Sequence, residues 1–200
     1  MTRPRFAKFR ATARDHRLAA LAVAAAALAL PALGGPAAVA ALRYERTAIA
    51  TGEWWRLLSC HLVHFDLRHL ALNLAGFGLL WWLFVADARP RDWFGVALAA
   101  ALAVGVGLYV LEPGVGWYLG LSGVLHGAWA AAAVFAWRRW PLEAIVTGAL
   151  LCAKLIAERA LGPLSGTLDP ALPVIVAAHL YGALGGAAAA FALRRPRASL

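Results

Sequence analysis

Residues 119–137 read LGLSGVLHGAWAAAAVFAW, and this stretch decides what kind of protein the chain forms. Ser122 and His126 are its strongly polar side chains, and the rest are apolar residues or glycine. A helix needs about 20 mostly apolar residues to cross the hydrocarbon layer of a membrane. The stretch is therefore expected to span a bilayer, with a hydroxyl and an imidazole near its beginning.

The composition of the whole chain agrees with this expectation. Of its 200 residues, 62% are hydrophobic and 14% are charged, and the mean hydropathy is +0.70. Soluble domains are about 45–50% apolar and about 25% charged. These values exclude a soluble globular domain and a disordered chain, and they favour an all-α integral membrane protein.

Six apolar segments predict a bundle of six transmembrane helices. They comprise residues 18–42, 62–85, 93–111, 119–137, 142–157 and 171–193. Pro31 and the run Gly34-Gly35-Pro36 interrupt the first segment. Its basic start, the apolar residues 18–30 and the small residues that follow also fit a secretory signal peptide, so a retained helix and a cleaved signal both stay open.

The positive charges predict the orientation of the bundle. Most of the 19 Lys and Arg side chains fall on the side that holds both termini, which the positive-inside rule places in the cytoplasm. The expected organisation is a basic tail at residues 1–17, a membrane domain at 18–193 and a second basic tail at 194–200. Residues 43–61, 112–117 and 158–169 then face outward. The net charge of +9 lies in short clusters between apolar runs, so no nucleic-acid partner is expected.

Polar side chains gather in the outer half of three predicted helices. They are His64, His69, Asn73, Ser122, His126 and His179. Ionisable groups inside a membrane segment are costly and mark functional sites by default. The cluster therefore predicts an active site near the outer face.

Ser122 and His179 are the candidate nucleophile and base. Gly120 and Gly123 flank the hydroxyl at a helix N-terminus, where backbone N–H groups favour a developing anion. Gly182, one turn after His179, belongs to a small-residue face that allows a close helix contact. An imidazole held against the hydroxyl would take its proton and return it to a leaving amine. Val at position 124 excludes the Gly-x-Ser-x-Gly elbow of α/β-hydrolases.

His69 and Asn73 share one helical face and can both donate hydrogen bonds to an oxyanion. The alternative is a metal site built from His61, His64 and His69. His126 is either a second base or a packing partner of His179. Neither a metal nor a cofactor is expected.

Two further pairs of residues have more than one possible role. Lys154 and Glu158 are one helical turn apart, and they form either an interfacial ion pair or a contact that shapes the site or binds substrate. Cys60 and Cys152 both fall near the outer side, where a disulfide is a hypothesis.

Together these residues resemble the rhomboid intramembrane serine proteases over about residues 43–193. The matching pieces are Trp55-Arg56, HFDLRH at 64–69 with Asn73, GLSG at 120–123, and Ala178-His179 with Gly182. The resemblance implies a rhomboid-like fold with Ser122 as nucleophile and His179 as base. It also implies an oxyanion hole of the Ser122 N–H, His69 and Asn73, and a fold-stabilising role for Trp55 and Arg56. Many members carry Tyr where His126 stands.

The Cys60-His61 pair, residues 120–127 and the Lys154 and Glu158 pair resemble the rhombosortase branch of that family. This implies single-pass substrates with C-terminal Gly-Gly tails, and an active site on the periplasmic side of a bacterial inner membrane. The alternatives are a pseudoprotease that binds transmembrane helices without cleavage, a small transporter or metal-handling protein, and a structural membrane protein.

Overall fold

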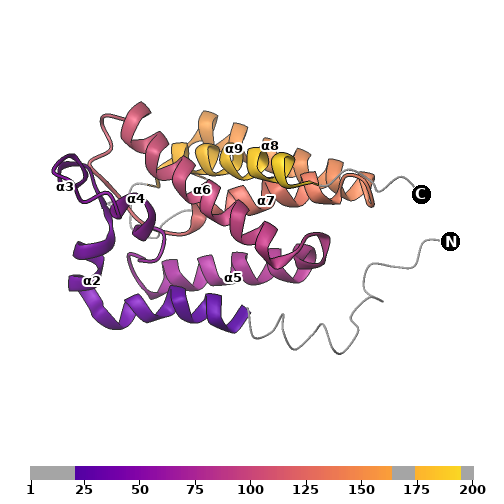
Figure 1. Ribbon diagram of the computed structural model, residues 1–200. Helices are drawn as coiled ribbons and strands as arrows, with labels where there is room; N and C mark the ends of the chain where they lie inside the picture. Colours follow the sequence, from indigo (N-terminus) through magenta and orange to yellow (C-terminus); the bar gives the residue numbers. More distant parts are fainter. Residues whose placement is uncertain (1–20, 164–173, 195–200) are drawn as a thin grey trace.

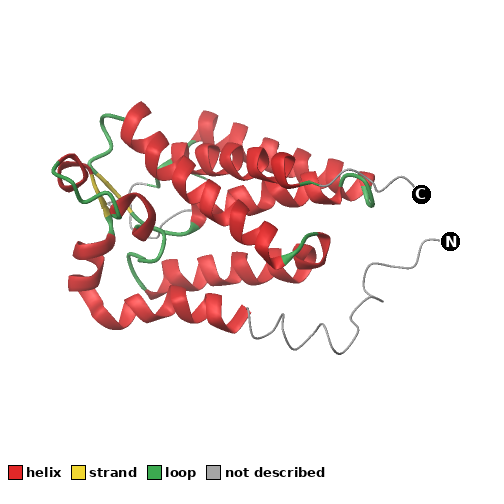
Figure 2. Ribbon diagram, viewed as in Figure 1, coloured by secondary structure: helices red, strands yellow, loops and turns green. Residues whose placement is uncertain are grey.

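The described part of the chain, residues 21–163 and 174–194 of the computed structural model, is almost entirely helical (Figures 1 and 2). Residues 21–29 are α-helical. The elements that follow are η2 (Leu30–Gly34), α2 (Gly35–Leu42), β1 (Tyr44–Glu45), α3 (Arg46–Ala50), α4 (Arg56–Ser59), α5 (Leu67–Phe84), η3 (Val85–Asp87), α6 (Pro90–Leu111), β2 (Trp117–Tyr118), α7 (Ser122–Ala136), α8 (Pro141–Leu161) and α9 (Val176–Leu193).

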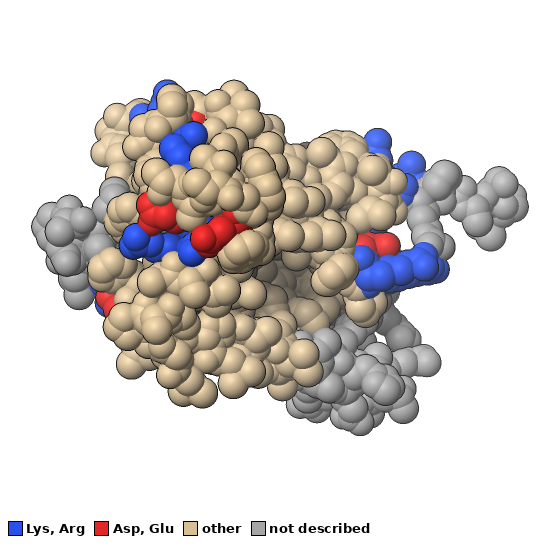
Figure 3. All heavy atoms as spheres, turned by 60° about the vertical axis from the view of Figure 1, so that its left-hand side comes forward, with Lys and Arg blue, Asp and Glu red and all other residues tan. Residues whose placement is uncertain are grey.

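Four helices in the described residues are long and apolar enough to cross a membrane. They are Leu21–Leu42, Leu67–Asp87, Pro90–Leu111 and Val176–Leu193. Helix α7 is shorter, and α8 carries Glu143, Lys154, Glu158 and Arg159 along its length. On the face seen in Figure 3, charged side chains gather toward the two ends of the molecule, and the surface between them carries few. The predicted all-α, multi-pass membrane architecture is confirmed at this level.

The helix boundaries correct those predicted from hydropathy. Helix α5 begins at Leu67, not at residue 62, because the Asp66 carboxylate accepts the His69 N–H at 2.7 Å as an N-cap. Helices α6 and α8 begin at Pro90 and Pro141, which suit the first helical position. Helix α8 runs on to Leu161, so Glu158 lies in a helix and not in the outward loop expected at 158–169.

Two other boundaries bear on the predicted site. Helix α7 starts at Ser122 itself, three residues later than predicted. Helix α9 begins at Val176, while residues 171–173 of the predicted sixth segment lie outside the described residues. So do the proposed tail at 1–17 and most of that at 194–200. The first segment is interrupted as predicted, by the 3-10 turn over Leu30–Gly34 and a positive φ of 55° at Gly35.

A structured loop follows the first helical segment and carries α3, α4 and β1. Strand β1 pairs antiparallel with β2, with Tyr44 opposite Tyr118. Arg46 caps the C-terminal end of helix α6. Its Nη2 donates to the carbonyls of Leu108, Tyr109 and Glu112 at 2.9 Å each. These bonds satisfy carbonyls that the last turn of a helix leaves without partners.

Trp55 and Arg56 lie in this loop and differ in burial. The Arg56 side chain is buried and donates to the carbonyls of Ala40 at 2.8 Å and Arg43 at 3.0 Å, and to the Glu53 carboxylate at 2.6 Å. These bonds tie the loop to the end of α2. Trp55 is 55% exposed, so of these two residues it is Arg56 whose side chain holds the loop.

The core lies between α6, α7 and α9, which run side by side in Figure 1. Tyr44, Cys60, Val104, Leu108 and Ala178 form one buried cluster under the structured loop. This cluster joins the loop to the helices that carry the candidate site.

Candidate active site

Ser122 and His179 come together although 57 residues separate them. The Nε2 atom of His179 lies 3.0 Å from the Ser122 Oγ. His179 is 2% exposed, while Ser122 is half-buried. The hydroxyl is thus within hydrogen-bond reach of an imidazole, as a general base requires.

The turn before Ser122 is fixed from three sides. The Gly120 N–H donates to the Cys60 carbonyl at 2.9 Å. The Gly120 carbonyl accepts from the Tyr118 hydroxyl at 3.1 Å, and the His61 Nδ1 lies 3.2 Å from it. Gly120 has a φ of 111°, a conformation that strains residues with a side chain. The Cys60-His61 pair therefore holds the start of α7 in place.

Gly182 and Gly186 bring α9 against α7, which confirms the close contact predicted from their spacing. A Cβ added to Gly182 would lie 1.9 Å from the Gly123 carbonyl oxygen, and one added to Gly186 would lie 2.2 Å from the Gly127 carbonyl oxygen. Since a side chain fits at neither position, backbone meets backbone. This approach allows the short Ser122 side chain to reach His179.

Glu158 of α8 lies on the other side of the imidazole. Its Oε2 is 2.8 Å from the His179 Nδ1, and its Oε1 accepts a hydrogen bond from the Lys154 ammonium. The Glu158 side chain is 0% exposed. The interfacial ion pair considered above is therefore only part of the arrangement, because the carboxylate also faces the site.

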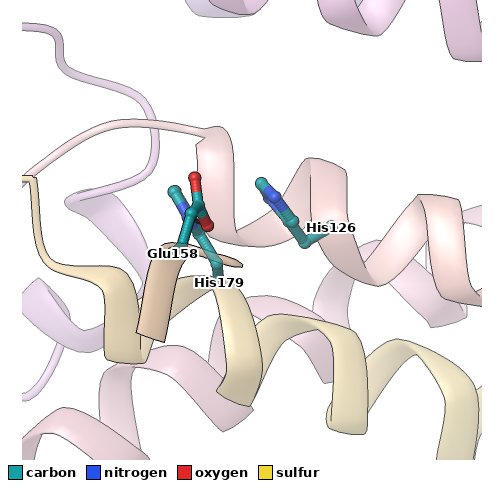
Figure 4. A group of neighbouring side chains, drawn as sticks. All are labelled: His126, Glu158 and His179. Atoms are coloured by element: carbon teal, nitrogen blue, oxygen red, sulfur yellow. Dashed lines mark hydrogen bonds and ion pairs between the residues drawn. The ribbon is translucent and has the colours of Figure 1, made fainter. Parts of the chain in front are cut away.

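His126 packs its ring on the ring of His179. The ring centroids are 4.0 Å apart and the planes differ by 11°. The His126 Nδ1 lies 2.7 Å from the Ser122 carbonyl oxygen, so this nitrogen carries the proton and donates. Figure 4 shows His126, Glu158 and His179 approaching one another from three helices. His126 stacks beside the base and does not face the Ser122 hydroxyl as a second base would.

His69 and Asn73 lie on α5, close to the Gly120 turn. The His69 Nε2 is 2.8 Å from the position that a Cβ on Gly120 would take. The Phe65 N–H donates to His69 Nδ1 over a long 3.4 Å, which leaves the proton on Nε2, toward the turn. Asn73 is 5% exposed and its Nδ2 donates to the His69 carbonyl at 3.0 Å, which leaves one amide hydrogen for another acceptor.

Burial keeps the side chains of His64 and Tyr118 uncharged at neutral pH. It lowers the pKa of His64 to about 4, with a smaller effect from His69, whose ring centroid is 5.2 Å away. Burial also raises the pKa of Tyr118. At neutral pH these groups add no net charge beside the Gly120 turn.

The metal site considered for His61, His64 and His69 does not form. The His61 nitrogens face the carbonyls of Gly120 at 3.2 Å and Ala101 at 3.1 Å, so they are already engaged. In the described residues the group with ligand atoms within 4.8 Å of one another is His126, Glu158 and His179. The Lys154 ammonium already occupies the Glu158 carboxylate, and the two stacked imidazoles hold their in-plane lone pairs parallel. This arrangement suits proton transfer better than coordination of a cation.

The two cysteines lie in different surroundings and are not bonded to each other. Cys60 is buried, Cys152 is exposed, and both are free thiols. Burial raises the pKa of the Cys60 thiol to about 12. The disulfide hypothesis is therefore wrong for this structure.

Sequence reasoning missed the contact between Glu158 and His179. One signal was present: a carboxylate in an apolar helical segment, one turn after Lys154, is costly unless it is paired. The spacing identified the Lys154 partner but could not identify a partner on another helix.

Comparison with known proteins found a family model and a relative that match this chain. Residues 51–196 match the family model described as the Rhomboid domain. The chain is also 28% identical over 157 residues to the Rhomboid protease GluP of Bacillus subtilis (strain 168). That alignment covers 77% of this chain and 29% of the relative, so the chain spans less than a third of the length of that protein.

Proposed function

This chain belongs to the rhomboid family, whose members are intramembrane serine proteases, and from this premise we propose that it hydrolyses a peptide bond of membrane protein substrates with Ser122 and His179 as a catalytic dyad. The observation that carries the proposal is the 3.0 Å contact between His179 Nε2 and Ser122 Oγ. Both side chains belong to helices that a close backbone contact holds together.

The chemistry follows from these two groups. His179 Nε2 takes the hydroxyl proton while Ser122 Oγ bonds to the scissile carbonyl carbon. The tetrahedral intermediate then breaks its C–N bond, and the imidazolium returns the proton to the leaving amine. Water hydrolyses the acyl-enzyme by the same steps, with His179 again as base.

The oxyanion would be stabilised by three donors. The Ser122 N–H is at the first position of α7, where a backbone N–H has no acceptor within the helix. His69 Nε2 faces the Gly120 turn, and Asn73 retains an amide hydrogen. Donors of this kind are worth about 2.7–4 kcal/mol each in acyl transfer.

The proposed substrates are single-pass proteins of the bacterial inner membrane, including exported proteins with C-terminal Gly-Gly tails. The proposed topology has six spans and places both termini in the cytoplasm. Helix α7 would be a shorter span and α8 a more polar one, beside the four long apolar helices. The active site would then face the periplasm, on the side of α3 and α4. The resemblance of residues 120–127 and of the Lys154 and Glu158 pair to rhombosortases supports this substrate class.

Replacement of the nucleophile tests the proposal. Ser122→Ala should abolish both cleavage of a co-expressed Gly-Gly-tailed substrate and labelling by a fluorophosphonate probe, because only an activated serine reacts with the probe. His179→Ala should behave in the same way. Immunoblots of the substrate and gel fluorescence of the labelled chain are the measurements.

Thr51→Ala serves as a matched control, since it removes another hydroxyl, one that donates to the Thr47 and Ala48 carbonyls in the structured loop. Cleavage that persists in Ser122→Ala would place the nucleophile elsewhere. A wild-type chain that binds the substrate but neither cleaves it nor takes the label would be a pseudoprotease, and the proposal would be wrong.

A further inference from the structure

Glu158 is a carboxylate at a position where an unpaired charge would be costly. Its side chain is 0% exposed and lies on helix α8. Two groups satisfy it: Lys154 Nζ donates to Oε1, and His179 Nδ1 lies 2.8 Å from Oε2. Each carboxylate oxygen therefore has its own partner, as a buried ionised carboxylate requires.

These contacts determine which imidazole nitrogen carries the proton. An ionised carboxylate only accepts hydrogen bonds, so His179 Nδ1 must be the donor. Nε2 then presents its lone pair to the Ser122 hydroxyl at 3.0 Å. This is the tautomer that a general base needs.

We propose that Glu158 is the positioning residue of the catalytic histidine, and that Lys154 keeps Glu158 ionised and oriented. This inference rests on the proposed function of Ser122 and His179. It replaces the dyad by a Ser122, His179 and Glu158 arrangement whose carboxylate is supplied by α8.

The role of the carboxylate is electrostatic throughout the reaction. The Ser122 proton moves to His179 Nε2 and from there to the leaving amine, and Glu158 neither gains nor loses a proton. The imidazolium that forms is stabilised by the negative charge 2.8 Å away. Among the described residues, the other ionisable groups facing His179 are His126, stacked on its ring, and Lys154, whose positive charge Glu158 offsets.

The decisive variant is Glu158→Gln, which keeps the shape and removes the charge. In this variant Lys154 would hold the amide oxygen, and the amide NH₂ would then face His179 Nδ1. The proton would be forced onto Nε2, the wrong nitrogen for a base. We expect fluorophosphonate labelling of Ser122 to slow by about 10³-fold, since replacing the carboxylate of a known triad by an amide costs about 10⁴ in kcat.

A pH profile separates this role from a merely structural one. Without the negative charge the imidazolium is less stable, so the pH of half-maximal labelling should move to lower values in Glu158→Gln. Glu158→Asp keeps the charge and should label faster than Glu158→Gln, with its midpoint close to that of the wild type. Glu143→Gln, which neutralises a carboxylate at the other end of α8, is the matched control and should label as the wild type does.

The double variant Lys154→Met with Glu158→Gln tests the role of the lysine. Without the ammonium the amide is free to turn its oxygen to His179 Nδ1, so labelling should recover at least about tenfold relative to Glu158→Gln alone. A double variant no faster than Glu158→Gln would overturn the role proposed for Lys154.

Failure of this inference can be distinguished from failure of the proposed function. Wild-type rate and midpoint in Glu158→Gln, while Ser122→Ala remains unlabelled, would overturn the inference and leave the protease proposal intact. Absence of Ser122 labelling in the wild-type chain would remove the proposed function, and the inference with it.

Discussion

At the candidate site, the neighbours of each histidine fix which of its ring nitrogens carries a proton. His126 donates through Nδ1 to the Ser122 carbonyl, and its buried Nε2 has no hydrogen-bond partner among the described residues, so the ring that stacks on His179 is neutral. In the proposed reaction His179 becomes protonated, and its positive charge then lies against this ring face. An aromatic face attracts a cation by about 0.5–2 kcal/mol. The stack thus favours the imidazolium without competing for the Ser122 proton.

The oxyanion donors make a prediction at the same scale. His69→Ala and Asn73→Ala should each lower kcat by about 10²–10³, with a small change in KM, because the donors act mainly on the charge of the transition state. Steady-state cleavage of a purified substrate in detergent is the measurement. Leu72→Ala, at an exposed position of the same helix, should have little effect. A rise in KM with unchanged kcat would assign His69 and Asn73 to substrate binding instead.

At the scale of elements, the contact between α7 and α9 determines whether the site exists. Its width is set by Gly123, Gly127, Gly182 and Gly186, and the helices meet through their backbones. Small residues at a helix interface let the two backbones approach closely, and van der Waals packing at such contacts helps to drive helix association in membranes. The distance between Ser122 and His179 therefore depends on glycines that take no part in the proposed chemistry.

Gly182→Ala tests this dependence. The added methyl group would lie 1.9 Å from the Gly123 carbonyl oxygen, so the helices must separate. We expect the free energy of unfolding to fall by about 1–3 kcal/mol and labelling of Ser122 to weaken. Thermal unfolding in detergent and probe labelling are the measurements.

Gly78→Ala is the matched control, because a Cβ at Gly78 of α5 would meet nothing within 4 Å. Its stability and labelling should equal or exceed those of the wild type. Equal stability and labelling in Gly182→Ala would mean that the helix contact tolerates more separation than the backbone distances indicate.

For the whole molecule, the layout of charge and apolar surface predicts how it lies in the bilayer. One helix starts at Leu21, and α9 ends at Leu193. Both of these helix ends lie on the side of the molecule opposite α3 and α4 (Figure 1). Arg138 and Arg139 follow the end of α7. Positive charge near short loops favours the cytoplasmic side.

Reporter fusions test this orientation. A reporter that is active only in the cytoplasm should be active when fused after Leu200, and a reporter active only in the periplasm should be active when inserted in the loop at Gly114. Reversed activities would place the active site on the cytoplasmic face. A reporter inserted in the loop after Arg139 provides the internal control, since it should match the fusion after Leu200.

Much of this protein could be predicted from the amino-acid sequence because the signals are local. Apolar length predicted the four helices that are long enough to cross a membrane, although it predicted six spans in all. Pro31 with Gly34 and Gly35 predicted the break in the first segment, and the spacing of Gly182 and Gly186 predicted a close helix contact. The candidate nucleophile, base and oxyanion donors were selected because polar groups are rare in such segments. Helix starts were less accurate, since hydropathy does not register the Asp66 cap or the Pro90 and Pro141 positions.

Only the tertiary structure decided which of these groups meet. Sequence spacing relates residues on one helix, as it did for Lys154 and Glu158, but the direction a side chain faces depends on how its helix is rotated against its neighbours. That rotation brings Glu158 of α8 to His179 of α9, directs His61 to two carbonyls rather than to a metal, and leaves Cys60 and Cys152 apart. These contacts arise where helices distant in the chain pack together. In such a close-packed interior, the orientation of each side chain depends on all the helices that surround it.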